Sequence, residues 1–557
     1  MSKKQKVNTG QHLIIPNLNK YLKYHNLPIK LDEEGICHAL STLYIQYVLE
    51  GKEQEFVEIL SFIAQKIPPT TELNVKLFSL VEKIIALQVS DDLSTRNRFS
   101  QSNSIEQLEV KGKDLRSIFQ IGLKTSRENW AEIIKQIDLK PNEAMRVCSL
   151  DHAIAIVRDG NGYKVYDPNN SIVSKRFDDV TKMTKWLSGT AYNFSILPFA
   201  WRTTLDMHID VISTELPSDR TFPDKKALLD KYLTPVQKKL NPKVGGGLYF
   251  AMKYDDAEAA EYIFNDSKTQ LSEDELSNAG IVAINSDSAK ALEKLIHKLQ
   301  KENKNELLGP FFMLACQNGS YRCFAMLLQG QEIRDLYEEI ISDAHEMILK
   351  KVFAGLNDHL IGRVMDDVLK KHNANVFTPR LLTDLIDISI KERNYQGVKL
   401  IAEKINDLAK KIDDPELRLK FLKKAIKQND PLMVRVLIEK LKITKDELNC
   451  MDISITMINK QNIEIFTTLK KKGYEFSPQA VDLIERKQKN SVGFLKSLGI
   501  ALISFSEFLL QQSKIKVDNN KLRLFFDFKK KFVDIKLNDT LTQGPQDDPT
   551  IKSFSGN

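Results

Sequence analysis

The second half of the chain contains helix-sized segments that recur at a fixed interval, and this repetition constrains the fold more than any other feature. Ala251, Ala283 and Ala315 hold the same place in three such segments and are 32 residues apart. Each segment joins two apolar stretches of helical periodicity by a short turn rich in Asn, Asp or Gly. Similar segments begin near residues 385, 421, 453 and 481. The period predicts a stack of helix pairs that share one continuous core.

This repeat length of helix–turn–helix units resembles that of ankyrin repeats. The TPLH start of that family is missing from every unit, and only Gln317-Asn318-Gly319 keeps its usual turn. The resemblance implies an all-α ankyrin-like solenoid over residues 245–500, with an irregular or inserted unit between about residues 330 and 380. A different α-solenoid or a plain helical domain is the alternative. Because such stacks work through their surface, the array implies a protein partner.

Composition excludes several classes of protein. The 557 residues include 81 Lys and Arg against 74 Asp and Glu, and this surplus of +7 is too small to indicate nucleic-acid binding. Five scattered cysteines without a CxxC pair favour a reducing compartment. The start of the chain is polar, with no secretory signal. The longest apolar run, residues 498–510, is too short for a transmembrane segment.

The segment Lys514–Lys536 holds eight Lys and Arg and three Asp, so it carries most of the net charge. We expect it to be the solvated basic face of a C-terminal cap at residues 501–540. The alternative is a patch for an acidic partner or a membrane surface. Residues 541–557 are expected to be a disordered tail.

The first part of the chain has a mixed pattern after an N-terminal extension at residues 1–30. Period-two alternation predicts strands on either side of the turn at Asp159–Gly162, because Gly and Asn favour tight hairpins. Residues 31–205 are therefore expected to form an α+β domain, and residues 206–244 a linker. The predicted helices are Ile36–Leu49, Glu55–Gln65, Val75–Leu87 and Leu115–Gln136, and the predicted strands are His152–Val157, Tyr163–Tyr166 and Ala191–Phe199.

Three residues of this domain suit nucleophilic catalysis. Cys37 follows a Gly at the expected start of a helix, where the helix dipole and unpaired N–H groups favour a thiolate. His152 leads a predicted strand, and Asp167 ends the next one. In a hairpin we expect these two side chains to lie opposite each other, so that the carboxylate can orient the imidazole.

The ordered motifs GICHALS, DHAIAI and YDPNN resemble those of papain-fold cysteine peptidases, and most closely those of the Yersinia outer protein T type. The resemblance covers roughly residues 30–200. It implies Cys37 as nucleophile, His152 as general base and then acid, and Asp167 as the orienting group. A polypeptide substrate follows from it, and no cofactor. Together with the repeats, the chain also resembles ankyrin-bearing effectors that intracellular bacteria such as Legionella inject into host cells, which implies a bacterial protein translocated into the host cytoplasm.

The sequence departs from the papain pattern at the oxyanion site. Papain-like enzymes use a Gln or Asn side chain before the Cys, but Leu31 stands six residues before Cys37. Asn26 is the nearest preceding amide and is the expected oxyanion donor, beside the Cys37 N–H. This departure leaves two alternatives: an interaction scaffold without turnover, or a thiol acyltransferase or deamidase that uses the same triad.

Other motifs do not make a site. Asn170 occupies the position where an EF-hand beginning at Asp159 needs a bidentate Glu, so calcium is excluded. Cys316 and Cys323 have no His pair at zinc spacing and are expected in the core. Residues 245–247, Gly-Gly-Gly, lack the GK[ST] of a P-loop and indicate a hinge.

Overall fold

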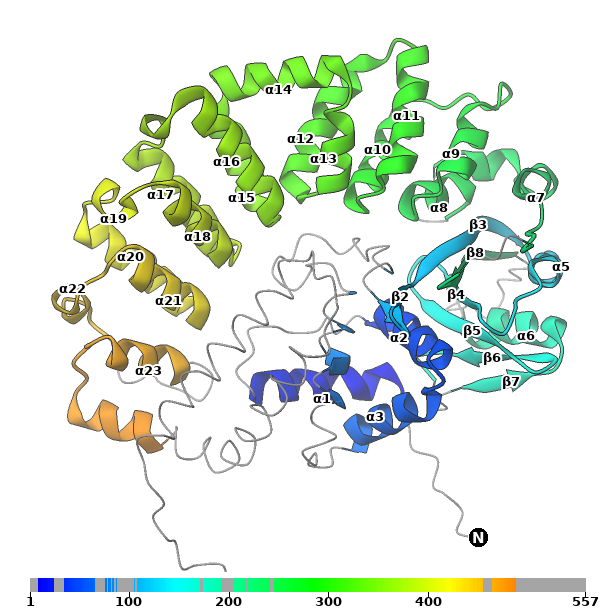
Figure 1. Ribbon diagram of the computed structural model, residues 1–557, viewed down its shortest axis with the longest axis horizontal. Helices are drawn as coiled ribbons and strands as arrows, with labels where there is room; N and C mark the ends of the chain where they lie inside the picture. Colours follow the sequence, from blue (N-terminus) through cyan, green and yellow to red (C-terminus); the bar gives the residue numbers. More distant parts are fainter. Residues whose placement is uncertain are drawn as a thin grey trace, which may run out of the picture.

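The computed structural model describes residues 9–24, 35–65, 108–170, 174–191, 204–215, 219–240, 245–453 and 463–486, with a few positions between 76 and 105. A mixed region built on a sheet comes first, and an arc of helices follows it along the chain (Figure 1). The prediction of an α+β region followed by a helical one is therefore confirmed. Among the described residues, every helix is too short or too polar to cross a membrane.

The sheet has six antiparallel strands in the spatial order β3-β8-β4-β5-β6-β7. Their bounds are β3 (Arg116–Ser126), β4 (Ala144–Cys148), β5 (Ala153–Asp159), β6 (Gly162–Tyr166), β7 (Lys175–Phe177) and β8 (Thr204–Ser213). A separate two-stranded ribbon joins β1 (Glu109–Val110) to β2 (Lys113–Asp114).

Helices cover both faces of this sheet (Figure 1). Because side chains alternate along a strand, Ala155 and Val157 of β5 pack on one face, and Ile154 and Ile156 on the other. The first face carries α1 (Gln11–Tyr24), α2 (Cys37–Leu49) and α3 (Glu53–Gln65), and the second carries α5 (Arg127–Ile137) and α6 (Val180–Trp186).

Three expectations for this region need correction. The helix expected from Leu115 is strand β3 up to Ser126, because its side chains alternate in burial with a period of two. Strand β8 begins at Thr204 and runs into the expected linker, where it pairs with β3 and β4, so the domain extends to Ser213. Helix α1 packs with α2 and α3 in one core, so residues 9–24 belong to the domain and are not an extension.

The array joins the sheet through α7 (Lys225–Tyr232) and a 3-10 turn, η3 (Pro235–Lys238). The Gln237 side chain accepts a hydrogen bond from the Lys124 N–H at 2.7 Å and donates one to the Lys124 carbonyl at 2.6 Å, as a neighbouring strand would. A Cβ at Gly122 of β3 would lie 2.4 Å from the Phe250 Cβ, so only glycine lets the first array helix pack this closely. Sheet and array therefore share one continuous core.

Helix pairs recur along the described part of the array, each with a tight turn whose first or second residue has positive φ. The residue that follows the positive-φ residue is polar. The hydroxyls of Ser288 and Ser320, for example, donate to carbonyls of the preceding unit at 3.1 and 2.6 Å. These bonds satisfy helix-end carbonyls and fix the stacking of the units. The pairs are α8 (Gly247–Lys253) with α9 (Ala257–Phe264), α10 (Glu273–Asn285) with α11 (Ala289–Lys301), α12 (Leu308–Asn318) with α13 (Tyr321–Leu327), α15 (His345–Ala354) with α16 (Asp358–His372), α17 (Pro379–Lys391) with α18 (Tyr395–Lys404), and α20 (Pro415–Lys427) with α21 (Pro431–Lys440).

The 32-residue spacing of the alanines has a structural basis. The carbonyls of Ala251, Ala283 and Ala315 each accept the N–H of the polar residue five positions later, at 2.8–3.0 Å. All three alanines are buried, where a larger side chain would separate neighbouring units.

The expected irregularity between residues 330 and 380 is an additional helix, α14 (Gln331–Asp343), that crosses the outer edge of the arc (Figure 1). The described array also contains α19 (Leu408–Lys411), α22 (Lys445–Asn449), α23 (Ile463–Lys471) and a further helical stretch at residues 478–486. The expected cap, Lys514–Lys536, the tail and nearly all of the strand expected at Ala191–Phe199 lie outside the described residues.

Candidate active site

Cys37 is the first residue of α2, as the sequence predicts. Gly35, two residues earlier, has φ of 152°, a conformation that favours glycine. The first N–H groups of a helix have no partner within it, and the helix dipole adds positive potential there. One turn further on, the Ser41 hydroxyl donates to the carbonyl of Ala153 at 2.9 Å, which fixes α2 against the start of β5. Cys37 is therefore held beside His152.

His152 and Asp167 meet at one end of the β5–β6 hairpin. The His152 Nε2 lies 2.8 Å from the Asp167 Oδ1, and both side chains are more than nine-tenths buried. The two-residue turn at Gly160 and Asn161 pairs Ala155 with Tyr166. By this register Asp167 faces residue 154, so its contact with His152 is diagonal across the hairpin. The sequence pattern predicts that the two residues lie directly opposite each other, and this detail is corrected.

Backbone hydrogen bonds fix both partners. The His152 N–H donates to the Ser149 hydroxyl at 3.1 Å, and the His152 carbonyl accepts the Ser149 N–H at 2.8 Å. The Asp167 Oδ1 also accepts the Asn169 N–H at 2.9 Å. The imidazole and the carboxylate thus have little freedom to rotate apart, which is what preorganised acid–base chemistry requires.

Cys37 completes the set through the other side of the imidazole. Burial lowers the pKa of His152, but hydrogen bonds to Asp167 and to Cys37, with the charges of both, outweigh it and raise the pKa to about 9. Since the Nε2 faces Asp167, the Nδ1 is the atom that can exchange a proton with the thiol. At neutral pH His152 is therefore protonated in this arrangement and places a positive charge beside Cys37.

The raised pKa of His152 predicts a pH-dependent stability. The ordinary value of 6.5 rises to about 9 on folding, so the contribution is complete below pH 6.5 and is lost as the pH rises through 9. The difference corresponds to about 3 kcal/mol at most. Urea unfolding of wild type and His152→Gln at pH 6, 7.5 and 9.5 measures it. We expect the wild type to have the higher free energy of unfolding at pH 6 and to lose this difference by pH 9.5. The same dependence on pH in both proteins would contradict a raised pKa of His152.

Gln11 is the functional residue that the sequence reasoning missed. It begins α1, its Oε1 accepts the Ile36 N–H at 3.0 Å, and its Nε2 donates to the Asn169 Oδ1. The Asn169 Nδ2 in turn lies 3.4 Å from the His152 Nδ1. A side-chain amide is therefore held next to the residue that precedes Cys37, where an oxyanion donor is needed.

The position of Gln11 explains why it was missed. It is 26 residues before Cys37, and only the packing of α1 onto α2 and α3 brings it to the residue before Cys37. Its one sequence signal is a polar amide at the start of an amphipathic segment, which is not specific. Asn26, the donor expected from the sequence, lies outside the described residues. Asn169, in the turn after Asp167, contacts both Gln11 and His152.

The remaining thiols do not form sites. Burial raises the pKa of Cys148, of Cys323 and of Cys316, the last to about 12. Cys450 is exposed. Within the described part of the chain, no cluster of three or more His, Cys, Asp and Glu side chains could hold a metal ion.

Comparison with known proteins assigns no relative. No protein-family model matches the chain, and neither a curated protein nor a solved structure matches it significantly. The chemistry must therefore be argued from the arrangement itself. A thiol at a helix start, an imidazole between it and a buried carboxylate, and a nearby amide can together attack and release an acyl group.

Proposed function

We propose that the N-terminal region is a papain-like thiol hydrolase, most simply a peptidase, and that the helical array is an ankyrin-like surface that brings it to a protein substrate. The observation that carries the proposal is the contact of His152 with both Asp167 and Cys37 at the start of α2. The resemblance of the motifs to effector peptidases supports action inside a host cell after translocation from a bacterium.

In the proposed reaction the Cys37 thiolate attacks the acyl carbon of the substrate, and a sulfur–carbon bond forms. The His152 imidazolium donates its Nδ1 proton to the leaving amine as the bond to carbon breaks. Neutral His152 then accepts a proton from water, whose oxygen attacks the thioester, and the acid leaves as the thiolate and imidazolium return. The Nε2 proton stays on His152 throughout the reaction, and its hydrogen bond to Asp167 orients the ring.

Gln11 is proposed to donate its amide to the tetrahedral oxyanion, with the Cys37 N–H as the second donor. The bond from the Ile36 N–H fixes the Gln11 Oε1, and the Nε2 donates to the Oδ1 of Asn169, the residue that contacts the His152 ring. Gln11→Ala should therefore lower the acylation rate by about 10²–10³-fold. The rate of p-nitrophenol release from p-nitrophenyl acetate measures this. Gln54→Ala, an exposed glutamine of α3, is the matched control and should react as wild type; equal rates in all three proteins would exclude Gln11.

The overall proposal is tested by mass spectrometry after the same reaction. Samples are quenched in acid while p-nitrophenol is still being released. An acetyl group on the peptide that contains Cys37 then supports thiol acyl chemistry, and unmodified Cys37 in those samples contradicts it. Incubation with host-cell extract then separates the reaction types: a cut chain indicates a peptidase, an added group an acyltransferase, and Asn or Gln converted to acid a deamidase.

A second candidate is an interaction scaffold without turnover. The low exposure of Cys37, His152 and Asp167, at 5, 8 and 4%, favours it, since a substrate must reach the thiol. If partner capture and the cellular effect both survive in Cys37→Ala, the scaffold accounts for the function. Loss of the effect with capture intact supports the hydrolase.

A further inference from the structure

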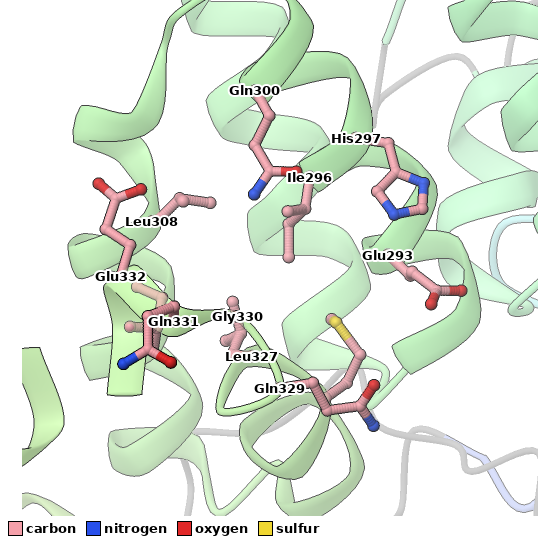
Figure 2. A pocket seen from close by; sticks show the side chains of 12 residues that line it. Glu293, Ile296, His297, Gln300, Leu308, Leu327, Gln329, Gly330, Gln331 and Glu332 are labelled. Atoms are coloured by element: carbon pink, nitrogen blue, oxygen red, sulfur yellow. The ribbon is translucent and has the colours of Figure 1, made fainter. Parts of the chain in front are cut away.

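The helical array contains an open pocket of about 250 Å³ beside the additional helix α14. Figure 2 shows Glu293, Ile296 and His297 on one side of it, and Gln331 and Glu332 on the other. Its wall includes buried Leu308 and Leu327 besides Ile296. The pocket therefore combines an apolar floor with a polar rim, the arrangement of a side-chain binding site.

The pocket follows from the irregularity of the array. After α13 the chain does not stack another regular pair but turns at Gly330 into α14, which crosses the outer edge of the arc (Figure 1). Ile333 and Tyr337 bury one side of α14 against the array, and the opening lies between its first turn and α11.

The charge around the pocket is negative and uncompensated. Helix α14 carries a single cation, Arg334, whose guanidinium is held by the carbonyl oxygens of Leu328 and Gln329. None of the acidic side chains of α14 makes an ion pair with the residues that the structure describes, nor does Glu293 on the opposite rim. These side chains of α14 are Glu332, Asp335, Glu338, Glu339 and Asp343.

The first half of the array is also negatively charged over a longer stretch of sequence. Residues 245–349 contain nine Lys and Arg against eighteen Asp and Glu, whereas residues 350–453 contain twenty-one against sixteen. An acidic field of this extent raises the local concentration of cationic segments and disfavours anionic ones.

We propose that this pocket binds a lysine or arginine side chain from a basic, partly apolar segment of a partner protein. The methylene stem of such a side chain would lie on Ile296, Leu308 and Leu327. Its charged head would lie at the rim, in the negative field of Glu293 and Glu332, which stand on opposite sides of the opening (Figure 2). The inference rests on the proposed function in one respect, the role of the array in binding a protein, and it adds the chemistry of the segment that is bound. Binding is measured without turnover, so the two proposals are tested separately. Absence of peptide binding does not bear on the thiol chemistry, and absence of thiol acylation does not bear on the pocket.

The experiment measures fluorescence anisotropy of a labelled hexapeptide that alternates lysine and leucine, with the full-length Cys37→Ala protein at physiological ionic strength. We expect saturable binding that weakens at least tenfold in Glu293→Gln/Glu332→Gln. The same peptide with glutamate in place of lysine should not bind. Absence of saturable binding to the parent protein overturns the proposal.

The matched control removes two exposed carboxylates elsewhere on the array, in Glu403→Gln/Glu439→Gln, with the same change in net charge. Full affinity in this variant supports a specific site, whereas an equal loss in both pairs shows only general attraction and overturns the proposal. Carbodiimide cross-linking of the chain alone tests a competing occupant. A link from Glu293 or Glu332 to a lysine of Lys514–Lys536 would assign the pocket to the chain's own basic segment and also overturn it.

Discussion

Replacing Cys37 by alanine should abolish covalent labelling by a peptide acyloxymethyl ketone, a loss of at least about 10³-fold, because the thiolate is the atom that attacks. The expectation follows from the placement of Cys37 at the start of α2, in contact with an imidazole whose pKa is raised to about 9. His152→Gln should keep the thiol but slow labelling by about 10²–10⁴-fold, since it removes the positively charged imidazolium beside the sulfur.

The other cysteines allow a clean version of this experiment. The exposed Cys450 is the one described thiol outside the site that a reagent reaches readily, so labelling is compared in a Cys450→Ala background. Cys148→Ala is the matched control, because burial raises the pKa of that thiol and keeps it protonated. Circular dichroism confirms that each variant is folded. If the Cys37→Ala protein is labelled as fast as its parent, Cys37 has no part in the chemistry.

The second large effect is expected on stability, at the buried ion pair of Arg146 and Asp210. The Arg146 Nη2 donates to the Asp210 Oδ2 at 2.7 Å across strands β4 and β8, and its Nη1 donates to the Thr42 hydroxyl of α2 at 3.3 Å. Arg146→Met would leave a buried carboxylate without its cation. We expect a loss of about 3–5 kcal/mol in the free energy of unfolding, measured by urea denaturation.

A double variant distinguishes an uncompensated charge from lost packing. Arg146→Met/Asp210→Leu replaces the whole pair by apolar side chains and should recover most of the stability. The single variant should also be less defective at low pH. Burial raises the pKa of Asp210, so the carboxyl is favoured in its neutral form and the defect grows as the pH rises. Equal losses in the single and double variants would show that the pair itself is not responsible.

The sequence predicted those parts of the fold that depend on local patterns. The tight turn at Gly160 and the alternation on either side of it produce the β5–β6 hairpin, and the Gly before Cys37 precedes a helix start. Strand β3 was mistaken for a helix because its apolar residues match both periods over a short window. Strand β8 was missed because its role depends on pairing with β3 and β4, which are distant in the chain.

The sequence by itself determined the repeating helix pairs, the hairpin, and the identity of Cys37, His152 and Asp167 as candidates, because each depends on residues close together in the chain. Only the tertiary structure decided that Gln11 reaches the site, since its approach requires α1 to pack on α2 across a separation of 26 residues. It also decided the acidic pocket beside α14, because a pocket exists only where packed helices leave space, and no local pattern encodes that space.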